Sequence, residues 1–266
     1  MKVQGKTWVV TGGGSGIGRE LTLLLLRKGA RVAAVDVRMD NLQNTSRRAT
    51  RPDRLSLHEL DVTDRHAVEA LVGEVEATHG HVDGLINNAG IIQPFVPVNE
   101  LDYDVIDRVL NVNLMGTLYM VKSFLPTLLS RPEAHIANVS SMGGFFPFPG
   151  QTIYGASKAA VKLLTEGLYA ELLDTKVQVS VVMPGAVATG ITENSGVTMT
   201  ADPSSSRIPQ TAPDKAARII VKGLAANRLH IFVGTDARIM DLATKLAPQQ
   251  ATKLVQRQMK GLLAEQ

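Results

Sequence analysis

Residues 11–18 read Thr-Gly-Gly-Gly-Ser-Gly-Ile-Gly, directly after the apolar run at 7–11 and directly before a leucine-rich amphipathic segment. A glycine-rich turn between a strand and a helix lets the backbone approach a phosphate closely and points the helix N-terminus at it. The glycine spacing is G-x-x-x-G-x-G, with its glycines at Gly12, Gly16 and Gly18. The stretch therefore predicts a nucleotide-binding strand–turn–helix unit that opens an α/β fold.

The next apolar run decides between this interpretation and a merely flexible turn. That run, 31–35, is followed by Asp36, eighteen residues after Gly18. In dinucleotide-binding folds, an acidic residue at about this distance contacts the adenosine ribose. We therefore expect Asp36 to contact the ribose of a dinucleotide.

Short β-branched runs alternate with longer amphipathic segments along the whole chain. The connections are long enough for right-handed crossovers, which predicts parallel strands in a sheet covered on both faces. The pattern indicates one doubly wound α/β domain over residues 1–266. The expected strands are 7–11, 31–35, 55–60, 83–86, 134–139, 177–183 and 230–233.

The composition limits the classes of protein that fit. The chain has 266 residues, 44% of them hydrophobic and 20% charged, which is typical of a globular protein with a large core. No apolar run approaches the roughly 18 residues of a membrane span, and no signal-peptide segment is evident, so we expect a cytoplasmic protein. The absence of cysteine excludes disulfides, thiolate nucleophiles and thiolate metal sites.

The charge pattern argues against nucleic acid, although the net charge is +3 and the pI about 9.2. The one dense basic cluster contains no aromatic residues, so we interpret it as a solvated helix end and loop. The cluster consists of Arg47, Arg48, Arg51 and Arg54. The six histidines show no metal-ligand spacing, and we interpret them as loop or surface residues without a metal. These histidines are His58, His66, His79, His81, His135 and His230.

Further motifs follow the later strands in order. They are Asp61-Val62, Asn87-Asn88-Ala89-Gly90, Asn113, Ser141, Tyr154-Gly155-Ala156-Ser157-Lys158 and Pro184-Gly185-Ala186-Val187-Ala188-Thr189. Together with the glycine-rich turn, they resemble the short-chain dehydrogenase/reductase family over nearly the whole chain. The resemblance implies a Rossmann fold with a seven-stranded parallel sheet and a nicotinamide cofactor.

The resemblance also assigns roles to individual residues. It implies a catalytic set of Asn113, Ser141, Tyr154 and Lys158. It implies that the cofactor contacts Gly12, Ser15, Gly16, Ile17, Gly18, Asp36, Asp61, Val62, Asn88, Ala89, Gly90, Tyr154, Lys158, Pro184, Gly185, Val187 and Thr189. Because Asp36 would repel the 2′-phosphate of NADP, we expect NAD to be preferred, although Arg38 could soften this preference.

Tyr154 and Lys158 are four residues apart, so on a helix they share one face. A nearby ammonium favours the phenolate and lowers the pKa of the tyrosine, which could then exchange a proton with a substrate oxygen. By the resemblance, Ser141 binds that oxygen, Lys158 also binds the nicotinamide ribose, and Asn113 supports a water chain to solvent. The expected activity is interconversion of a secondary alcohol and a ketone.

Three other kinds of protein have related sequence patterns. A sugar-nucleotide epimerase or dehydratase of the extended branch would need a longer C-terminal substrate domain and usually a T-G-x-x-G-x-x-G turn. An enoyl reductase would space its tyrosine and lysine differently. A catalytically silent NAD-sensing or scaffold protein predicts a damaged catalytic set, whereas the set is intact here.

The substrate is suggested only by the stretch between Ser141 and Tyr154. It contains Phe145, Phe146 and Phe148, half of the six phenylalanines in the chain. These rings would suit an apolar or ring-containing substrate, or they would pack the loop or a subunit contact. The segment 185–212, rich in Gly, Ser, Thr and Pro, is expected to form one long lid loop.

The C-terminal segment, about 235–266, is expected to form a helical extension with helices near 236–246 and 250–263. Its second helix has an apolar stripe formed by Leu254, Val255, Met259, Leu262 and Leu263. The stripe would cover the pocket rim, a second subunit or a membrane interface. We favour the first two, because the stripe is narrow and lacks Trp and Phe, and we expect a homodimer or homotetramer.

Overall fold

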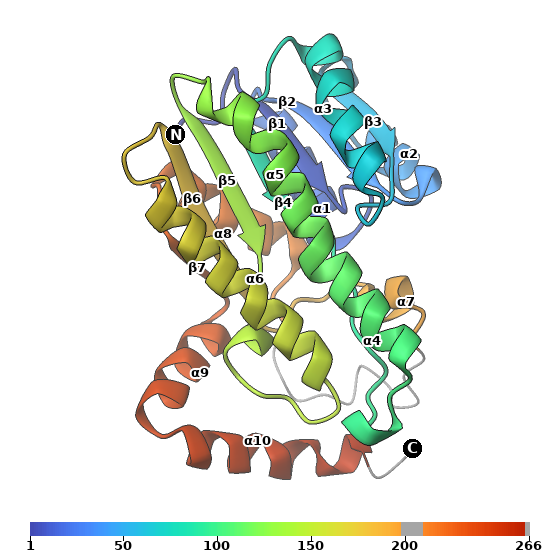
Figure 1. Ribbon diagram of the computed structural model, residues 1–266, viewed down its shortest axis with the longest axis vertical. Helices are drawn as coiled ribbons and strands as arrows, with labels where there is room; N and C mark the ends of the chain where they lie inside the picture. The colour runs from blue at the N-terminus through green and yellow to red at the C-terminus, as the bar shows by residue number, and fades with distance from the viewer. Residues whose placement is uncertain (198–209, 264–266) are drawn as a thin grey trace.

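One parallel sheet organises the protein. The computed structural model describes residues 1–197 and 210–263, with side chains up to Arg257 in the last helix. The sheet order is β3-β2-β1-β4-β5-β6-β7 (Figure 1). The strands are β1 (Thr7–Thr11), β2 (Arg31–Asp36), β3 (Leu55–Glu59), β4 (Gly84–Asn87), β5 (Ala134–Val139), β6 (Val177–Pro184) and β7 (His230–Val233). The predicted doubly wound α/β fold is confirmed, and every predicted strand boundary lies within one residue of the observed one.

The order of the strands creates a crevice at the centre of the sheet. The chain leaves β1 toward β2 on one side and later returns to pair β4 with the other side of β1. At such a switch point, the connections at the carboxyl ends of the strands diverge and leave room for a ligand. Gly84 of β4 leaves space for the ring of Trp8, its partner in β1, because a Cβ there would lie 2.3 Å from that ring.

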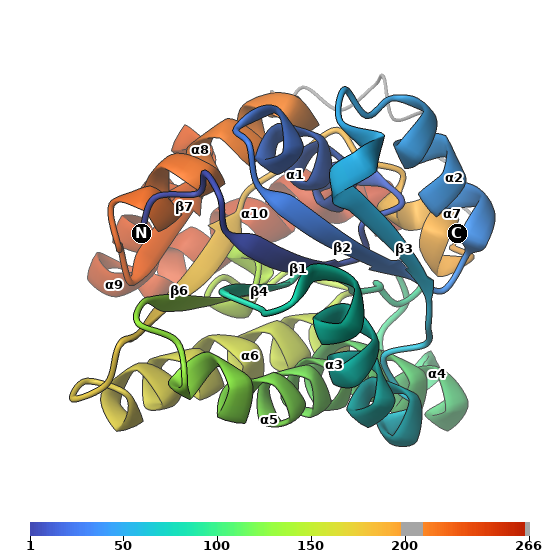
Figure 2. The same cartoon turned by 90° about the horizontal axis from the view of Figure 1, so that it is seen from above.

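Helices cover both faces of the sheet, as Figure 2 shows. On one face lie α1 (Gly16–Arg27) and α8 (Pro213–Ala225), and on the other lie α3 (Arg65–His79), α5 (Gly116–Leu129) and α6 (Thr152–Glu171). Neighbouring strand residues point to opposite faces, so Val10 joins the core under α1 and α8 while Val9 joins the core under α5. Strands buried on both faces read as continuous apolar runs, which explains why they were predictable.

Shorter elements connect the layers. They are α2 (Met39–Arg47), α4 (Tyr103–Leu110) and the 3₁₀ turns Pro52–Arg54, Val98–Glu100 and Met142–Gly144. A π-helical turn, Asn111–Met115, lies between α4 and α5. Such turns in otherwise α-helical segments are frequent at functional sites, and this one contains Asn113.

The segment 185–212 is not the single loop that the sequence predicted. Residues Ile191–Ser195 form a short helix, α7, and Val187 pairs with Thr211 in a parallel bridge. The helix has too few residues and too little apolar periodicity to be recognised from sequence. The part of this predicted lid at 198–209 lies outside the described residues.

The C-terminal extension forms two helices, α9 (Thr235–Leu246) and α10 (Pro248–Leu263), close to the predicted positions. Figure 1 shows α10 lying across the end of the molecule toward which β5 points. Ala251 and Val255 of α10 are buried in a small core with Phe146. The predicted stripe is therefore partly wrong, since Leu254 is exposed. The side chains of Met259, Leu262 and Leu263 lie outside the described residues.

The histidines lie in several different surroundings. The interpretation of all six histidines as loop or surface residues is wrong for two of them. His79 is buried at the end of α3, which packs on the sheet, and His135 is fully buried in β5, because that strand is covered on both faces. Burial lowers the pKa of His135 to about 3. Among the helices of the described residues, none is both long and apolar enough to cross a membrane.

Candidate active site

A cavity of about 690 Å³ opens at the carboxyl ends of the central strands. It is lined by nearly all of the residues that the sequence predicted for the site: Gly12, Ser15, Gly16, Ile17, Asp36, Asp61, Val62, Asn88, Ala89, Gly90, Ser141, Tyr154, Lys158, Pro184, Gly185, Val187 and Thr189. Gly18 and Asn113 lie behind this lining. The fold thus brings segments from across the chain into one site.

The glycine-rich turn is closed tightly on itself. Gly12 and Gly16 have φ values of +65° and +50°, a left-handed conformation that favours glycine. A Cβ on Gly18 would lie 2.1 Å from the carbonyl oxygen of Gly12, so only glycine fits at this position inside the turn. Helix α1 begins at Gly16, so its first backbone N–H groups have no partner within the helix.

Asp36 lies at the end of β2 and lines the cavity. One carboxylate oxygen accepts a hydrogen bond from the backbone N–H of Gly14 at 3.0 Å, and the other accepts one from the backbone N–H of Arg38 at 3.1 Å. The two bonds fix the carboxylate beside the glycine-rich turn. The side chain of Arg38 donates to Asn194 of α7.

Lys158 is buried on α6, with 4% of its surface exposed. Its Nζ donates a hydrogen bond to the carbonyl oxygen of Val139 at the end of β5, at 3.0 Å. Burial lowers the pKa of Lys158 to about 8. A Cβ on Gly90 would lie 2.9 Å from this Nζ, so the glycine leaves the space that the ammonium group needs.

Tyr154 lines the same cavity, but the direction of its pKa shift differs from the expectation. Burial raises the pKa of Tyr154, and an interaction with the Ser141 hydroxyl opposes the rise only in part. The expected lowering of this pKa by Lys158 is therefore wrong for these side-chain positions, in which the ammonium group donates to Val139. The shared helix face, by contrast, is confirmed.

The two serines that follow β5 have different roles in the structure. The Ser140 hydroxyl is buried and donates to the carbonyl oxygen of Lys158 at 2.7 Å, which ties β5 to α6. The Ser141 oxygen accepts from the backbone N–H of Gly143 at 3.0 Å and lines the cavity. Ser141 is therefore both a turn cap and a group that faces the site.

The side chain of Asn113 is fully used in positioning its neighbours. Its oxygen accepts from the backbone N–H of Ile91 at 2.8 Å, and its nitrogen donates to Ile91 O at 2.9 Å and to Ser157 Oγ at 3.0 Å. These bonds join the π-helical turn to α6 and to the loop after Asn88. Because both amide hydrogens are engaged, the side chain has no hydrogen left to donate to the expected water chain.

The loop after β6 is held from two sides. Asp236 in α9 accepts a hydrogen bond from the backbone N–H of Ala186 at 2.7 Å. A Cβ on Gly185 or on Gly234 would lie 2.1 Å from this carboxylate, so both glycines make room for it. On the other side, Thr211 exchanges backbone hydrogen bonds with residues 186 and 188 at 2.8 and 3.0 Å.

Comparison with known proteins shows the family of the chain. Residues 6–199 match the model of the short chain dehydrogenase family. The chain belongs to the short-chain dehydrogenase/reductase family. The oxidoreductase SadH of Mycobacterium tuberculosis is 35% identical over 261 residues, covering 95% of this chain and 94% of the relative. The chain is thus an oxidoreductase of the short-chain dehydrogenase type, and the resemblance inferred from the sequence is confirmed.

Solved structures of this family show the same fold. A short-chain dehydrogenase/reductase from Burkholderia phymatum, in complex with NAD, has a TM-score of 0.83 and 28% identity and covers 94% of this chain and 96% of its own. A short chain dehydrogenase from Burkholderia cenocepacia J2315, in complex with NADP, has a TM-score of 0.81 and 27% identity, with coverage of 96% and 99%. These relatives bind nicotinamide dinucleotides of both kinds.

The three phenylalanines of this short-chain dehydrogenase have different surroundings. Phe148 lines the main cavity together with Met142 and Phe95, a residue that the sequence did not single out. Phe146 is buried beneath this wall against α10. Phe145 lines a second cavity of about 130 Å³ and packs edge-to-face on Phe232. The expectation of a wall built from three rings is thus correct only for Phe148.

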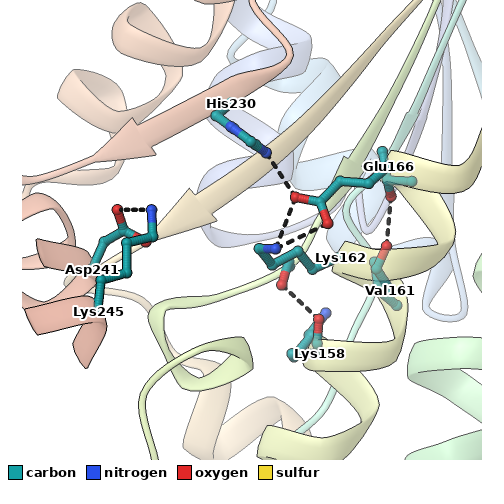
Figure 3. A network of polar contacts seen from close by, with 9 residues as sticks. Lys158, Val161, Lys162, Glu166, His230, Asp241 and Lys245 are labelled. Atoms are coloured by element: carbon teal, nitrogen blue, oxygen red, sulfur yellow. Dashed lines mark hydrogen bonds and ion pairs between the residues drawn. The ribbon is translucent and has the colours of Figure 1, made fainter. Parts of the chain in front are cut away.

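The far part of α6 is anchored to β7 by a polar network next to the second cavity. Figure 3 shows Lys162, Glu166 and His230 pointing toward one another. Lys162 Nζ and His230 Nε2 both lie 2.8 Å from Glu166 Oε1. Burial alone would raise the pKa of Glu166, but its hydrogen bonds with Lys162 and His230 hold that pKa below its ordinary value. The helix of Tyr154 is thereby fixed near its C-terminal end.

Helix α7 of the dehydrogenase contacts residues on two opposite sides of the cavity. Asn194 donates to Ser15 Oγ at 3.1 Å on the glycine-rich side. Ser195 Oγ accepts from the backbone N–H of Ile92 at 3.0 Å, and Ser195 O accepts from Arg108 at 3.3 Å on the opposite side. No local sequence pattern indicates these contacts, because they join segments that are far apart in the chain.

Proposed function

We propose that the protein interconverts a secondary alcohol and a ketone with NAD, using Tyr154 as the general acid and base. The observation that carries this proposal is the convergence of Tyr154, Ser141 and Lys158 on the cavity that the glycine-rich turn also lines. General acid–base catalysis requires the proton-transfer group and the substrate-binding group to face the same space. The membership of the chain in an oxidoreductase family supports the same conclusion.

The residues present fit a nicotinamide dinucleotide. A Cβ on Gly12 would lie 2.8 Å from Asn88 Nδ2, and a Cβ on Gly14 would lie 2.6 Å from the Cβ of Asn41, so the turn presents bare backbone. Bare backbone N–H groups at a helix N-terminus suit a pyrophosphate. We propose the cofactor contacts predicted from the sequence, with Gly18 supporting the turn from behind.

When bound, NAD supplies the hydride acceptor, and the protein supplies orientation and proton handling. In the proposed mechanism, Ser141 holds the substrate oxygen by a hydrogen bond. Tyr154 accepts the hydroxyl proton during oxidation and returns it during reduction. Lys158 binds the nicotinamide ribose with its ammonium group, while Asn113 positions Ser157 and the Ile91 backbone rather than carrying a proton on its amide.

NAD is the proposed cofactor, in preference to NADP. The Asp36 carboxylate lies at the end of β2 and would repel a 2′-phosphate. Arg38 could offset this repulsion, but its guanidinium group is engaged with Asn194. A hydrogen bond to a charged group contributes roughly 1.5–3 kcal/mol, so the preference should amount to about one to two orders of magnitude.

The proposed substrate is apolar or contains a ring. Apolar side chains from two separate segments form this part of the cavity wall: Phe95 from one, and Met142 and Phe148 from the other. We further propose a homodimer or homotetramer, since Leu163 on α6 and Leu173 just beyond it are 71% and 61% exposed.

The test is a screen of steroid, aliphatic, aromatic and polyol secondary alcohols, monitored by NADH absorbance. With the substrate found, Tyr154→Phe should lower kcat by about 10²–10⁴-fold, because it removes only the hydroxyl. Tyr169→Phe on the same helix is the matched control and should leave kcat unchanged. A Tyr154→Phe variant that retains more than about a tenth of wild-type kcat would assign proton transfer to another group. No reaction with any alcohol would favour a silent NAD-binding protein instead.

A further inference from the structure

Gln93 is a fully buried polar residue that the proposed mechanism does not use. It lies in the segment after β4, and none of its side-chain surface is exposed. Its Oε1 accepts hydrogen bonds from the backbone N–H groups of Ile153 at 2.8 Å and Tyr154 at 3.0 Å. Its Nε2 donates to the carbonyl oxygen of Gly150 at 3.0 Å. The side chain therefore binds both the start of α6 and the turn before it.

A second glutamine completes this connection from the other direction. Gln151 immediately precedes α6 and makes no side-chain cap to its own helix. Its Nε2 instead donates to the backbone oxygen of Gln93 at 2.8 Å. We call Gln93 and Gln151 the glutamine clasp. Four hydrogen bonds in a water-excluded space thus join the segment after Asn88 to the beginning of the helix that contains Tyr154.

The clasp caps the N-terminus of α6, which in most helices is done by a residue next to the helix start. The first backbone N–H groups of a helix have no partner within the helix, and a Ser, Thr, Asp or Asn at the N-cap usually accepts from them. Here the acceptor comes from a residue about 60 positions earlier in the chain. A distant acceptor fixes the helix start relative to another segment, which a local cap cannot do.

We propose that Gln93 is a positioning residue for catalysis. By holding the backbone of Tyr154 itself, it sets where the tyrosine hydroxyl meets the substrate oxygen that Ser141 binds. The inference rests on the proposed function. Gln93 does not line the cavity, so its loss should change the chemical step and leave cofactor contacts in place. A displacement of a reacting group by about 1 Å can lower a rate by about a hundredfold.

The experiment compares two substitutions of Gln93 with a control. Gln93→Met keeps the length of the side chain and removes its three hydrogen bonds, whereas Gln93→Glu keeps an acceptor for the two helix N–H groups. Asp83→Asn is the control for a loss of stability. Asp83 is fully buried and accepts from Thr7 N at 3.0 Å and Arg131 Nε at 3.0 Å, at the opposite end of the sheet.

We expect Gln93→Met to lower kcat by at least about tenfold while KM for NAD stays within about twofold of wild type. Gln93→Glu should recover most of the lost kcat. Asp83→Asn should lower Tm without changing kcat. A Gln93→Met variant with wild-type kcat, or a Gln93→Glu variant no better than Gln93→Met, would overturn the inference.

Hydrogen exchange provides a readout that does not depend on activity. The amides of Ile153 and Tyr154 should exchange at least about tenfold faster in Gln93→Met than in the wild type, and Asp83→Asn should leave them protected. If the wild type oxidises no alcohol, the proposed function fails, and these exchange rates still decide whether Gln93 holds the backbone of Tyr154. Unchanged exchange in Gln93→Met would show that it does not.

Discussion

The buried ammonium group of Lys158 should lower the free energy of unfolding of the protein at neutral pH. Burial moves its pKa from 10.5 to about 8. Each pKa unit corresponds to about 1.4 kcal/mol, so below pH 8 the charged lysine destabilises the folded state by about 3 kcal/mol. The Lys158→Met variant also loses the hydrogen bond to Val139, which contributes about 1 kcal/mol to the stability of the wild type. Lys158→Met should therefore stabilise the protein by about 2 kcal/mol at pH 7.

The pH dependence distinguishes this effect from a simple change in packing. Between pH 8 and 10.5 the unfolded chain still binds the lysine proton while the folded protein has released it. The stability of the wild type consequently rises with pH across this window, and the advantage of Lys158→Met should disappear by about pH 10. Activity of Lys158→Met should be lost at every pH.

Urea unfolding without cofactor, followed by the fluorescence of the buried Trp8, measures both quantities at pH 7 and pH 10. Lys122→Met, on the exposed surface of α5, is the matched control and should show no such pH-dependent difference. The reasoning fails if Lys158→Met is less stable than the wild type at pH 7 and the difference is the same at pH 10.

Three further predictions concern other parts of the molecule. Asp36→Ala should abolish the preference for NAD over NADP, measured as the ratio of kcat/KM values; an unchanged ratio would contradict the assignment. The unfolded chain protonates His135 near pH 6.5 and the folded protein only near pH 3, so the wild type should lose about 2 kcal/mol between pH 7 and 5 in urea unfolding. The His135→Met variant should not lose this stability between pH 7 and 5. An equal loss in both proteins would contradict the assignment of the effect to His135. Deleting residues 249–266 should raise KM for the substrate or lower the mass in light scattering, with NAD affinity unchanged; loss of vesicle binding alone would instead support a membrane contact.

The sheet was predictable because its strands are buried on both faces and end in polar motifs. The apolar runs 8–10 in β1 and 181–183 in β6 indicate the positions of these strands. The same burial explains the error on His135, since in such a strand even an imidazole is enclosed. Helix α7 was missed because its five residues, Ile-Thr-Glu-Asn-Ser, carry no helical periodicity.

The candidate site was predictable as a set of residues but not as a set of interactions. Spacing placed Tyr154 and Lys158 on one helix face, yet it could not show that the ammonium group donates to Val139. The direction of a pKa shift depends on burial and partners, which only tertiary structure provides. For the same reason Gln93 gave no signal, since its partners lie about 60 residues away.

The contact between Asp236 and Ala186 determines where the C-terminal helices can be exchanged between relatives. Although Asp236 belongs to α9, its carboxylate supports the loop after β6, and Gly185 and Gly234 are shaped around it. A chimera joined at the end of β7 would discard that support along with the helices. A junction after Ala237 keeps the loop intact and replaces the residues that pack on Phe146 and those of α9 that line the second cavity. The exchangeable module therefore begins inside the first turn of α9.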